Sequence, residues 1–271
     1  MRVRTSESGR SVFAATRHVV AVAGVLALLL LAGCGSSGNL LSAGTTALDV
    51  PAAPTPAYLA QAADRTVALE TGRIEAQVTG PGVDATVTGQ FDLTQRTAAL
   101  SLTVDAEGEA STADVVVADD ALYVRPDGFG AALGDALGTP WVKVDLTELT
   151  SMLPGTAEVP AVDPAELLDR LRAEGIEVSE VGREAVRGVD TTHYRAEVPA
   201  TTAGHELGAA TIDVWIDDDG LIRRVDLHSE DGVDARVELL DLGQPVSIET
   251  PPSDQVTDLG DLAGLLDKLT R

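Results

Sequence analysis

Residues 83–93 read VDATVTGQFDL, and residues 97–105 read TAALSLTVD. In both stretches, apolar side chains recur at nearly every second position and polar side chains fill most of the positions between them. Successive side chains of a β-strand point to opposite faces of the sheet, so this alternation is typical of antiparallel strands with one buried and one solvated face. These residues therefore predict half-buried antiparallel strands.

The same alternation continues along much of the chain. We expect further strands at residues 113–117, 122–124, 141–144, 176–186, 191–198, 210–216, 221–227 and 233–239. Asp119-Asp120, Asp219-Gly220 and Asp231-Gly232 separate neighbouring stretches and are typical of tight turns between paired strands.

Helical signals occur before, between and after these strands. Thr55 followed by Pro56 is typical of a helix start, and Gly72 is the expected end. The apolar stripe expected on this helix is Leu59, Ala62, Ala63 and Val67. Further helices are expected at residues 145–153, 163–174 and 259–269. The order of helix, sheet, helices and sheet predicts an α+β fold.

The first 34 residues have the layout of an export signal. A basic start is followed by an apolar run at residues 19–32, shorter than the about 20 residues that span a bilayer. Leu31-Ala32-Gly33-Cys34 closes this run, contains the one cysteine of the sequence, and resembles a bacterial lipobox. We expect residues 1–33 to be removed as a signal peptide and Cys34 to carry acyl chains. An ordinary cleaved signal or an uncleaved membrane anchor would leave the position of the cysteine unexplained.

Two further parts follow the cysteine. Residues 34–54 are rich in Gly, Ser and Pro without a sustained periodic pattern, which predicts a flexible tether. Residues 55–271 are long enough for a sizeable core and are expected to form a single domain.

The formal charge of the chain is -24 at pH 7. This acidity argues against binding of nucleic acid and against adhesion of the folded domain to anionic lipid headgroups, because both need clustered basic side chains. Two or three acyl chains on Cys34 would instead hold the protein on the extracytoplasmic face of the cell membrane.

Sequence motifs for catalysis are missing. There is no nucleophile elbow, phosphate-binding glycine loop or HExxH zinc motif, so we expect neither an enzyme nor a cofactor. His193, His205 and His228 are not at metal-ligand spacing, and the run Asp217-Asp218-Asp219-Gly220 fits a hairpin turn better than a calcium loop. No metal site is expected.

Several motifs together resemble those of a known family. They are the lipobox, Leu122-Tyr123-Val124 followed by Trp141-Val142-Lys143-Val144, His193-Tyr194, and Val214-Trp215-Ile216-Asp217. Over roughly residues 54–256 the chain resembles the LppX/LprAFG lipoproteins of mycobacteria and their relatives, which are similar in fold to LolA and LolB. The resemblance implies a curved antiparallel half-barrel, with helices over its concave face and a cavity for acyl chains, that carries glycolipids, lipoglycans or triacylglycerols.

The expected ligand is therefore a hydrophobic lipid. The aliphatic positions expected to form the walls of its pocket are Leu100, Leu102, Val104, Val115, Val117, Val214, Val225 and Val237. The same side chains also fit a dry, closed core, and the sequence does not distinguish the two arrangements. Trp141 and Trp215 fit either a pocket wall or the core, and residues 128–134 fit either a flap or a plain connection. The alternative function is a regulatory or docking lipoprotein that binds an envelope protein partner without a lipid cargo.

Overall fold

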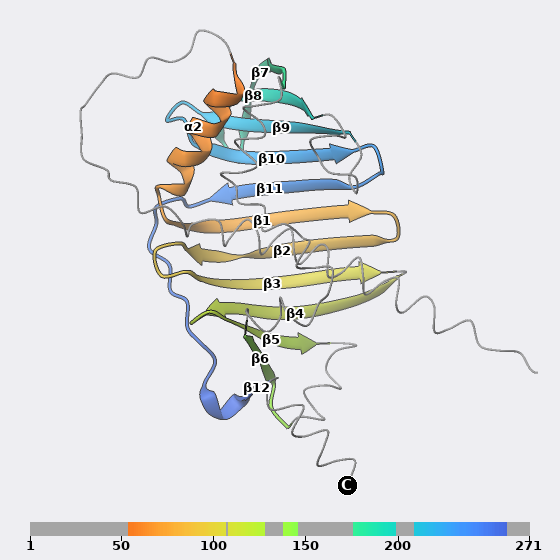
Figure 1. The fold of residues 1–271 in the computed structure, drawn as a ribbon, viewed down its shortest axis with the longest axis vertical. Coiled ribbons are helices and arrows are strands. Elements are labelled where there is room, and N and C mark those ends of the chain that lie inside the picture. The colour runs from red at the N-terminus through yellow and green to blue at the C-terminus, as the bar shows by residue number, and fades with distance from the viewer. Residues whose placement is uncertain (1–53, 107, 128–137, 146–175, 199–208, 259–271) are drawn as a thin grey trace, which may run out of the picture.

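The computed structural model describes residues 54–106, 108–127, 138–145, 176–198 and 209–258 (Figure 1). These ranges contain one 12-stranded curved sheet with the strand order β12-β6-β5-β4-β3-β2-β1-β11-β10-β9-β8-β7. The strands are β1 (Thr71–Gly80), β2 (Val83–Asp92), β3 (Thr97–Ala106), β4 (Glu109–Ala118), β5 (Ala121–Asp127), β6 (Trp141–Asp145), β7 (Val178–Val186), β8 (Val189–Val198), β9 (Ala210–Asp217), β10 (Ile222–Ser229), β11 (Asp234–Leu240) and β12 (Val256–Asp258).

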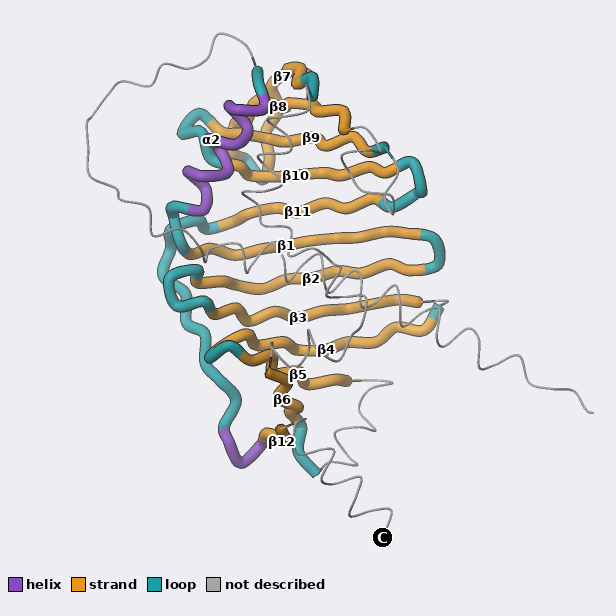
Figure 2. The backbone as a smooth tube through the Cα atoms, in the orientation of Figure 1, coloured by secondary structure: helices purple, strands orange, loops and turns teal. Residues whose placement is uncertain are grey.

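The sheet consists of two antiparallel meanders joined along one seam. The first runs from β1 to β6 and the second from β7 to β11, with each strand paired to the next along the chain (Figure 2). The seam is the antiparallel pair β1 and β11, in which Ala76 lies opposite Val237. At one edge β12 pairs in parallel with β6, and β7 forms the other edge, so the sheet does not close into a barrel.

The N-terminal helix α2 (Pro56–Val67) begins where the sequence predicts. Thr55 is its N-cap and its hydroxyl accepts a hydrogen bond from the backbone N–H of Tyr58. The predicted end at Gly72 is wrong, because the helix ends at Val67 and Gly72 already pairs with Phe91 within β1 and β2. A Cβ atom at Gly72 would lie 2.9 Å from the Phe91 ring, so a glycine at this position leaves room for the ring to pack against the backbone of β1.

The buried side of α2 also differs from the predicted stripe. Leu59, Ala62 and Thr66 are buried, whereas Val67 is 48% exposed. The prediction of Val67 on the apolar stripe is wrong, because Thr66 occupies the inward position of the last turn. Its hydroxyl donates to the carbonyl of Ala62 and accepts from the backbone N–H of Ile222 in β10. A polar side chain thus connects the end of the helix to the sheet.

The predicted tight turns are confirmed. Asp119 and Asp120 both have positive φ, at 53° and 55°, which fits a two-residue turn between β4 and β5. Gly220 and Gly232 have φ of 78° and 79° at the two turns that flank β10. The alternation predicts strands from residue 83 onward, and the structure adds β1 ahead of them and β12 near the end.

The α+β assignment rests on α2, the sheet and the short 3-10 helix η2 (Ser253–Gln255) within the described ranges. The helices predicted at residues 145–153, 163–174 and 259–269 fall outside those ranges except for Asp145, which ends β6. The predicted flap at residues 128–134 and the predicted signal peptide also lie outside them.

Candidate functional site

The eight aliphatic positions predicted as pocket walls lie on one face of the sheet. Residues paired directly across neighbouring strands point to the same face. The register connects Val214, Val225, Val237, Ala76, Val87 and Leu102 in one row across six strands. Leu100 and Val104 share this face because each lies two residues from Leu102 in the same strand. Val115 and Val117 share it because they pair with Leu100 and Ala98. We call this side of the sheet the apolar face and the other side the polar face.

Helix α2 covers the apolar face over β8 to β10 (Figure 1). Leu59 and Ala62 of the helix join Tyr194, Val214 and Ile216 of the sheet in one buried cluster. The exposed fractions of Val214 and Ile216 are 5% and 1%. Burial raises the pKa of Tyr194 to about 12, because a phenolate loses its hydration there. This end of the apolar face is therefore a closed core.

The apolar face differs over β3 to β5. Leu100, Leu102, Val115 and Val117 are only half-buried there, although their neighbours Ala98 and Val104 are buried. Leu100 extends toward β2, where a Cβ atom at Gly89 would lie 2.8 Å from its Cδ2 atom. Half-buried aliphatic side chains thus form a continuous surface at this end, with no described helix packed on it.

The polar face carries a network of ion pairs over β8 to β11. The indole of Trp215 stacks on the ring of His193, with centroids 4.2 Å apart, and the Arg224 guanidinium lies 4.2 Å from the Trp215 ring centroid. His193 Nε2 is 2.6 Å from Asp213 Oδ1, and the Trp215 N–H donates to Glu184. Trp215, one of the two tryptophans considered for a pocket, is thus buried in a structural stack.

Two carboxylates anchor this network from buried positions. Asp226 accepts hydrogen bonds from Arg224 and Arg236, and Asp213 accepts them from Arg195 and His193. Burial by itself pushes the pKa of Asp226 up, but the two guanidinium groups hold it below its ordinary value, and the pKa of Asp213 is lowered in the same way by Arg195 and His193. Both carboxylates are therefore stabilised in the charged form.

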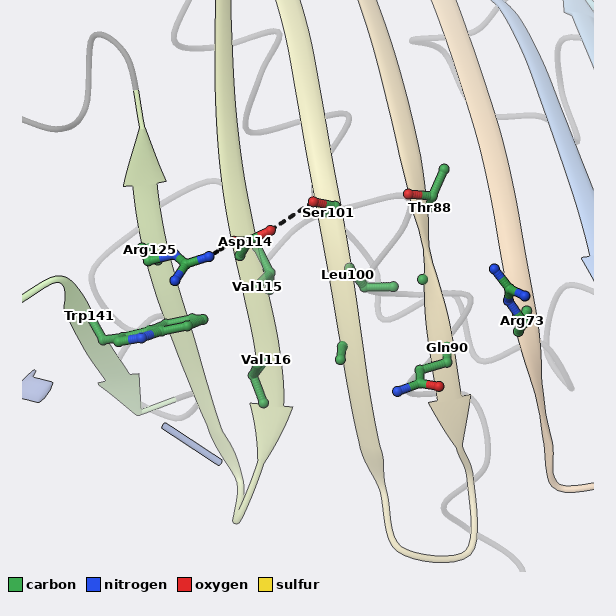
Figure 3. Close-up of a pocket in the computed structure, with 12 residues that line it drawn as sticks. Arg73, Thr88, Gln90, Leu100, Ser101, Asp114, Val115, Val116, Arg125 and Trp141 are labelled. Atoms are coloured by element: carbon green, nitrogen blue, oxygen red, sulfur yellow. Dashed lines mark hydrogen bonds and ion pairs between the residues drawn. The ribbon is translucent and has the colours of Figure 1, made fainter. Parts of the chain in front are cut away.

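A hollow of about 580 Å³ lies on the polar face over β2 to β6 (Figure 3). Five residues paired in one row cross it: Thr88, Ser101, Asp114, Arg125 and Trp141, the last placed by the β5 and β6 register. Leu100 and Val115 also border the hollow, but their side chains belong to the opposite, apolar face. The alternation places these polar side chains on the solvated face, but only the register between strands brings them together into one row.

The run of aspartates at the β9 and β10 turn forms the predicted hairpin. Asp217 Oδ1 accepts the backbone N–H groups of Asp219 and Leu221, and its Oδ2 accepts Arg223 Nε at 2.6 Å. The carboxylate of Asp217 is thus used within the turn. Among the described residues, no group of three or more His, Cys, Asp or Glu side chains is arranged to hold a metal ion.

Cys34 lies outside the described residues, as does His205. No helix within the described ranges is long and apolar enough to cross a membrane. The lipid attachment at Cys34 therefore stays a prediction of the sequence.

Comparison with known proteins finds similar lipoproteins. No family model matches the chain. The crystal structure of the lipoprotein LppX from Mycobacterium tuberculosis matches with a TM-score of 0.50 and 19% identity, covering 72% of this chain and 100% of LppX. LprG of Mycolicibacterium hassiacum, named as a lipoarabinomannan carrier protein, is 27% identical over 237 residues, which are 83% of this chain and 93% of LprG. The chain is thus similar to lipoproteins of the LppX/LprAFG family.

The similarity to LprG and LppX confirms the resemblance drawn from the motifs. LprF of Mycobacterium bovis also matches, with a TM-score of 0.42 and 19% identity over 74% of this chain and all of LprF. The fold shared with LppX is a large curved and unclosed antiparallel sheet, as described above. The predicted half-barrel is thus confirmed in its sheet, while α2 is the helix that the described residues place on the apolar face.

Proposed function

We propose that this protein, which is similar to the LppX/LprAFG lipoproteins, is a lipid-anchored lipoprotein of the cell envelope that carries an acylated lipid or lipoglycan against the apolar face of its sheet. The observation that carries the proposal is the row of aliphatic side chains that crosses six strands and ends in the half-buried surface over β3 to β5. The carrier name of LprG supports the same class of cargo.

The chemistry of the apolar face suits acyl chains. Its side chains at Leu100, Leu102, Val115 and Val117 are purely aliphatic and half-buried. Transfer of an acyl chain from water to such a surface gains about 25 cal/mol for each Å² of apolar area removed from water. No hydrogen bond or covalent step is needed, so the proposed role is passive binding and release.

The anchor is the second part of the proposal. A domain with a charge of -24 on the whole chain is repelled by anionic headgroups, so acyl chains on Cys34 would supply the attachment. We expect Cys34→Ser to leave the precursor unprocessed or to release the protein from membranes. Membrane fractionation with immunoblotting measures this, and normal processing with unchanged membrane association of the variant would contradict the anchor.

The cargo is tested by extraction. Full-length protein purified from membranes of the producing bacterium is expected to contain about one non-covalent acylated lipid per chain in its organic extract, measured by mass spectrometry. An unrelated lipoprotein purified in the same detergent is the control for bulk membrane lipid. If both extracts contain the same lipids in the same amounts, the carrier function is wrong.

A further inference from the structure

The hollow on the polar face is separate from the surface proposed to bind acyl chains. Asp114 and Val115 are neighbours in β4, so their side chains point to opposite faces of the sheet. Asp114 contributes its side chain to the hollow, whereas the side chain of Val115 belongs to the apolar face. Whatever occupies the hollow therefore meets different side chains from those that would contact an acyl chain.

Two neighbouring rows give the hollow an apolar side and a polar side. The first row contains Ser101, Asp114 and Arg125, which offer hydroxyl, carboxylate and guanidinium groups. The second contains Ala99 and Val116, paired directly with each other and flanked by Gln90. The hollow thus has apolar side chains directly beside charged and hydrogen-bonding ones.

The side chains of the polar row are connected by hydrogen bonds to one another. Ser101 Oγ donates to Asp114 Oδ1 at 2.7 Å, and Arg125 donates to Asp114 Oδ2. The Ser101 hydroxyl and the Arg125 guanidinium hold the pKa of Asp114 below its ordinary value, so the carboxylate is charged at neutral pH. Arg125 has five N–H donors and Asp114 about four lone-pair positions, so each retains hydrogen-bonding capacity after these contacts.

The aromatic end of the hollow is also held in place. Trp141 is half-buried, and the Arg125 guanidinium carbon lies 5.1 Å from the centroid of its ring. Figure 3 shows Arg125 between Asp114 and Trp141, connecting the carboxylate to the indole. The hollow therefore combines an ordered donor and acceptor pair with an aromatic wall.

We propose that this hollow on the polar face is a binding site for a neutral sugar unit of a glycan. A pyranose ring presents vicinal hydroxyl groups at its rim, which suit a fixed carboxylate and guanidinium pair, and C–H groups on its face, which pack on apolar and aromatic side chains. The volume of about 580 Å³ falls within the range of roughly 300–1,000 Å³ that is typical of small-molecule sites.

The charges favour a neutral ligand over an anion. Arg125 is neutralised by Asp114, and Arg73 at the other side of the hollow lies 3.6 Å from Asp241. The whole chain carries a formal charge of -24, which repels phosphate and sulfate groups. A sugar without charge gains the hydrogen bonds of the row without this repulsion.

The test uses the full-length protein in micelles of a detergent without a sugar headgroup. Saturation-transfer difference NMR with maltotriose and α-1,6-mannotriose as probes is expected to show signals from at least one of them, strongest for ring protons on one face. Asp114→Asn is expected to weaken binding by about tenfold or more, because it removes a charged hydrogen-bonding partner. Trp141→Leu is expected to abolish the preference for one ring face.

The matched control is Thr103→Ala. Thr103 is exposed on the same strand and the same face as Ser101 but does not border the hollow, so its replacement is expected to leave the signals unchanged. Thermal melting of each variant establishes that it is folded, and Ser101→Ala serves as a milder second variant of the row.

Three results would overturn the proposal. The first is that neither saccharide shows a saturation-transfer signal. The second is that the wild type and the folded Asp114→Asn variant give equal signals. The third is that an equal concentration of inorganic phosphate displaces the saccharide completely. The lipid content of the same samples separates this site from the proposed carrier function, because Asp114→Asn is expected to leave bound lipid unchanged.

Discussion

Val214 in β9 and Val115 in β4 come from similar alternating sequences and lie on the same face of one sheet, but their surroundings differ. Val214 is 5% exposed beneath α2, in contact with a closed cluster, whereas Val115 is half-buried. Alternation determines which face a side chain joins. What covers that face depends on other segments, so the same pattern produces a core at one end and a candidate ligand surface at the other.

The largest effect that tests this contrast is a cavity in the covered end. Ile216→Ala is expected to lower the free energy of unfolding by about 3 kcal/mol, because Ile216 is 1% exposed and the helix and sheet around it relax only partly. Urea denaturation measures the change.

The matched substitution at the other end is Val115→Ala. It is expected to cost no more than about 1 kcal/mol, since the two carbons removed are already partly hydrated. A loss for Val115→Ala that approaches the loss for Ile216→Ala, although one carbon fewer is removed, would show that both ends are closed cores.

A smaller effect compares the polar sides of the same two ends. Asp226→Asn is expected to cost about 2 kcal/mol at pH 7, because Asp226 is 3% exposed and accepts hydrogen bonds from Arg224 and Arg236. Asp114→Asn, in a more exposed pair with Arg125, is expected to cost less than about 1 kcal/mol.

The pH dependence of this cost has a definite sign. The pKa of Asp226 in the folded protein is lowered from its ordinary value of 3.8, so the carboxylate stabilises the fold above that pH and the contribution is lost as pH falls through the lower folded pKa. Urea denaturation at a series of pH values is expected to show the Asp226→Asn difference shrinking below about pH 4. A difference that grows on acidification would contradict the assignment.

The smallest expected effect is that of a chelator. EDTA is expected to leave the melting temperature of the protein unchanged. The Asp217 carboxylate already accepts hydrogen bonds from two backbone N–H groups and from Arg223, so it is not available to a metal ion. A large fall in Tm that calcium or zinc restores would be evidence for a metal site that the sequence does not predict.

Local signals in the sequence were sufficient for much of the sheet. Thr55 and Pro56 locate the start of α2, and the alternation places Leu100, Val115 and Val214 on one face, because capping and strand geometry depend on neighbours in sequence. The end of α2 was not predictable in the same way. Gly72 belongs to β1 because of its pairing with Phe91, a contact made across the sheet.

The parts that sequence reasoning missed depend on register between distant residues. Thr88, Ser101, Asp114, Arg125 and Trp141 come from five strands and meet only because the pairing aligns them. Trp215 likewise becomes a structural residue through stacking with His193 and Arg224. Polar positions of an alternating strand give no sign of such partners until the strand order is known.

The most direct test of the central claim, that the apolar face over β3 to β5 binds acyl chains, is Val115→Trp. An open surface accepts the added volume, so the variant is expected to keep the wild-type Tm and to lose the lipid found in the wild-type extract, whereas a filled core would lose about 1–3 kcal/mol through overpacking. Thr103→Trp adds the same side chain to the polar face of β3 and is expected to retain both stability and lipid. The claim would be contradicted if the wild-type protein contained no lipid and the Val115→Trp variant were strongly destabilised.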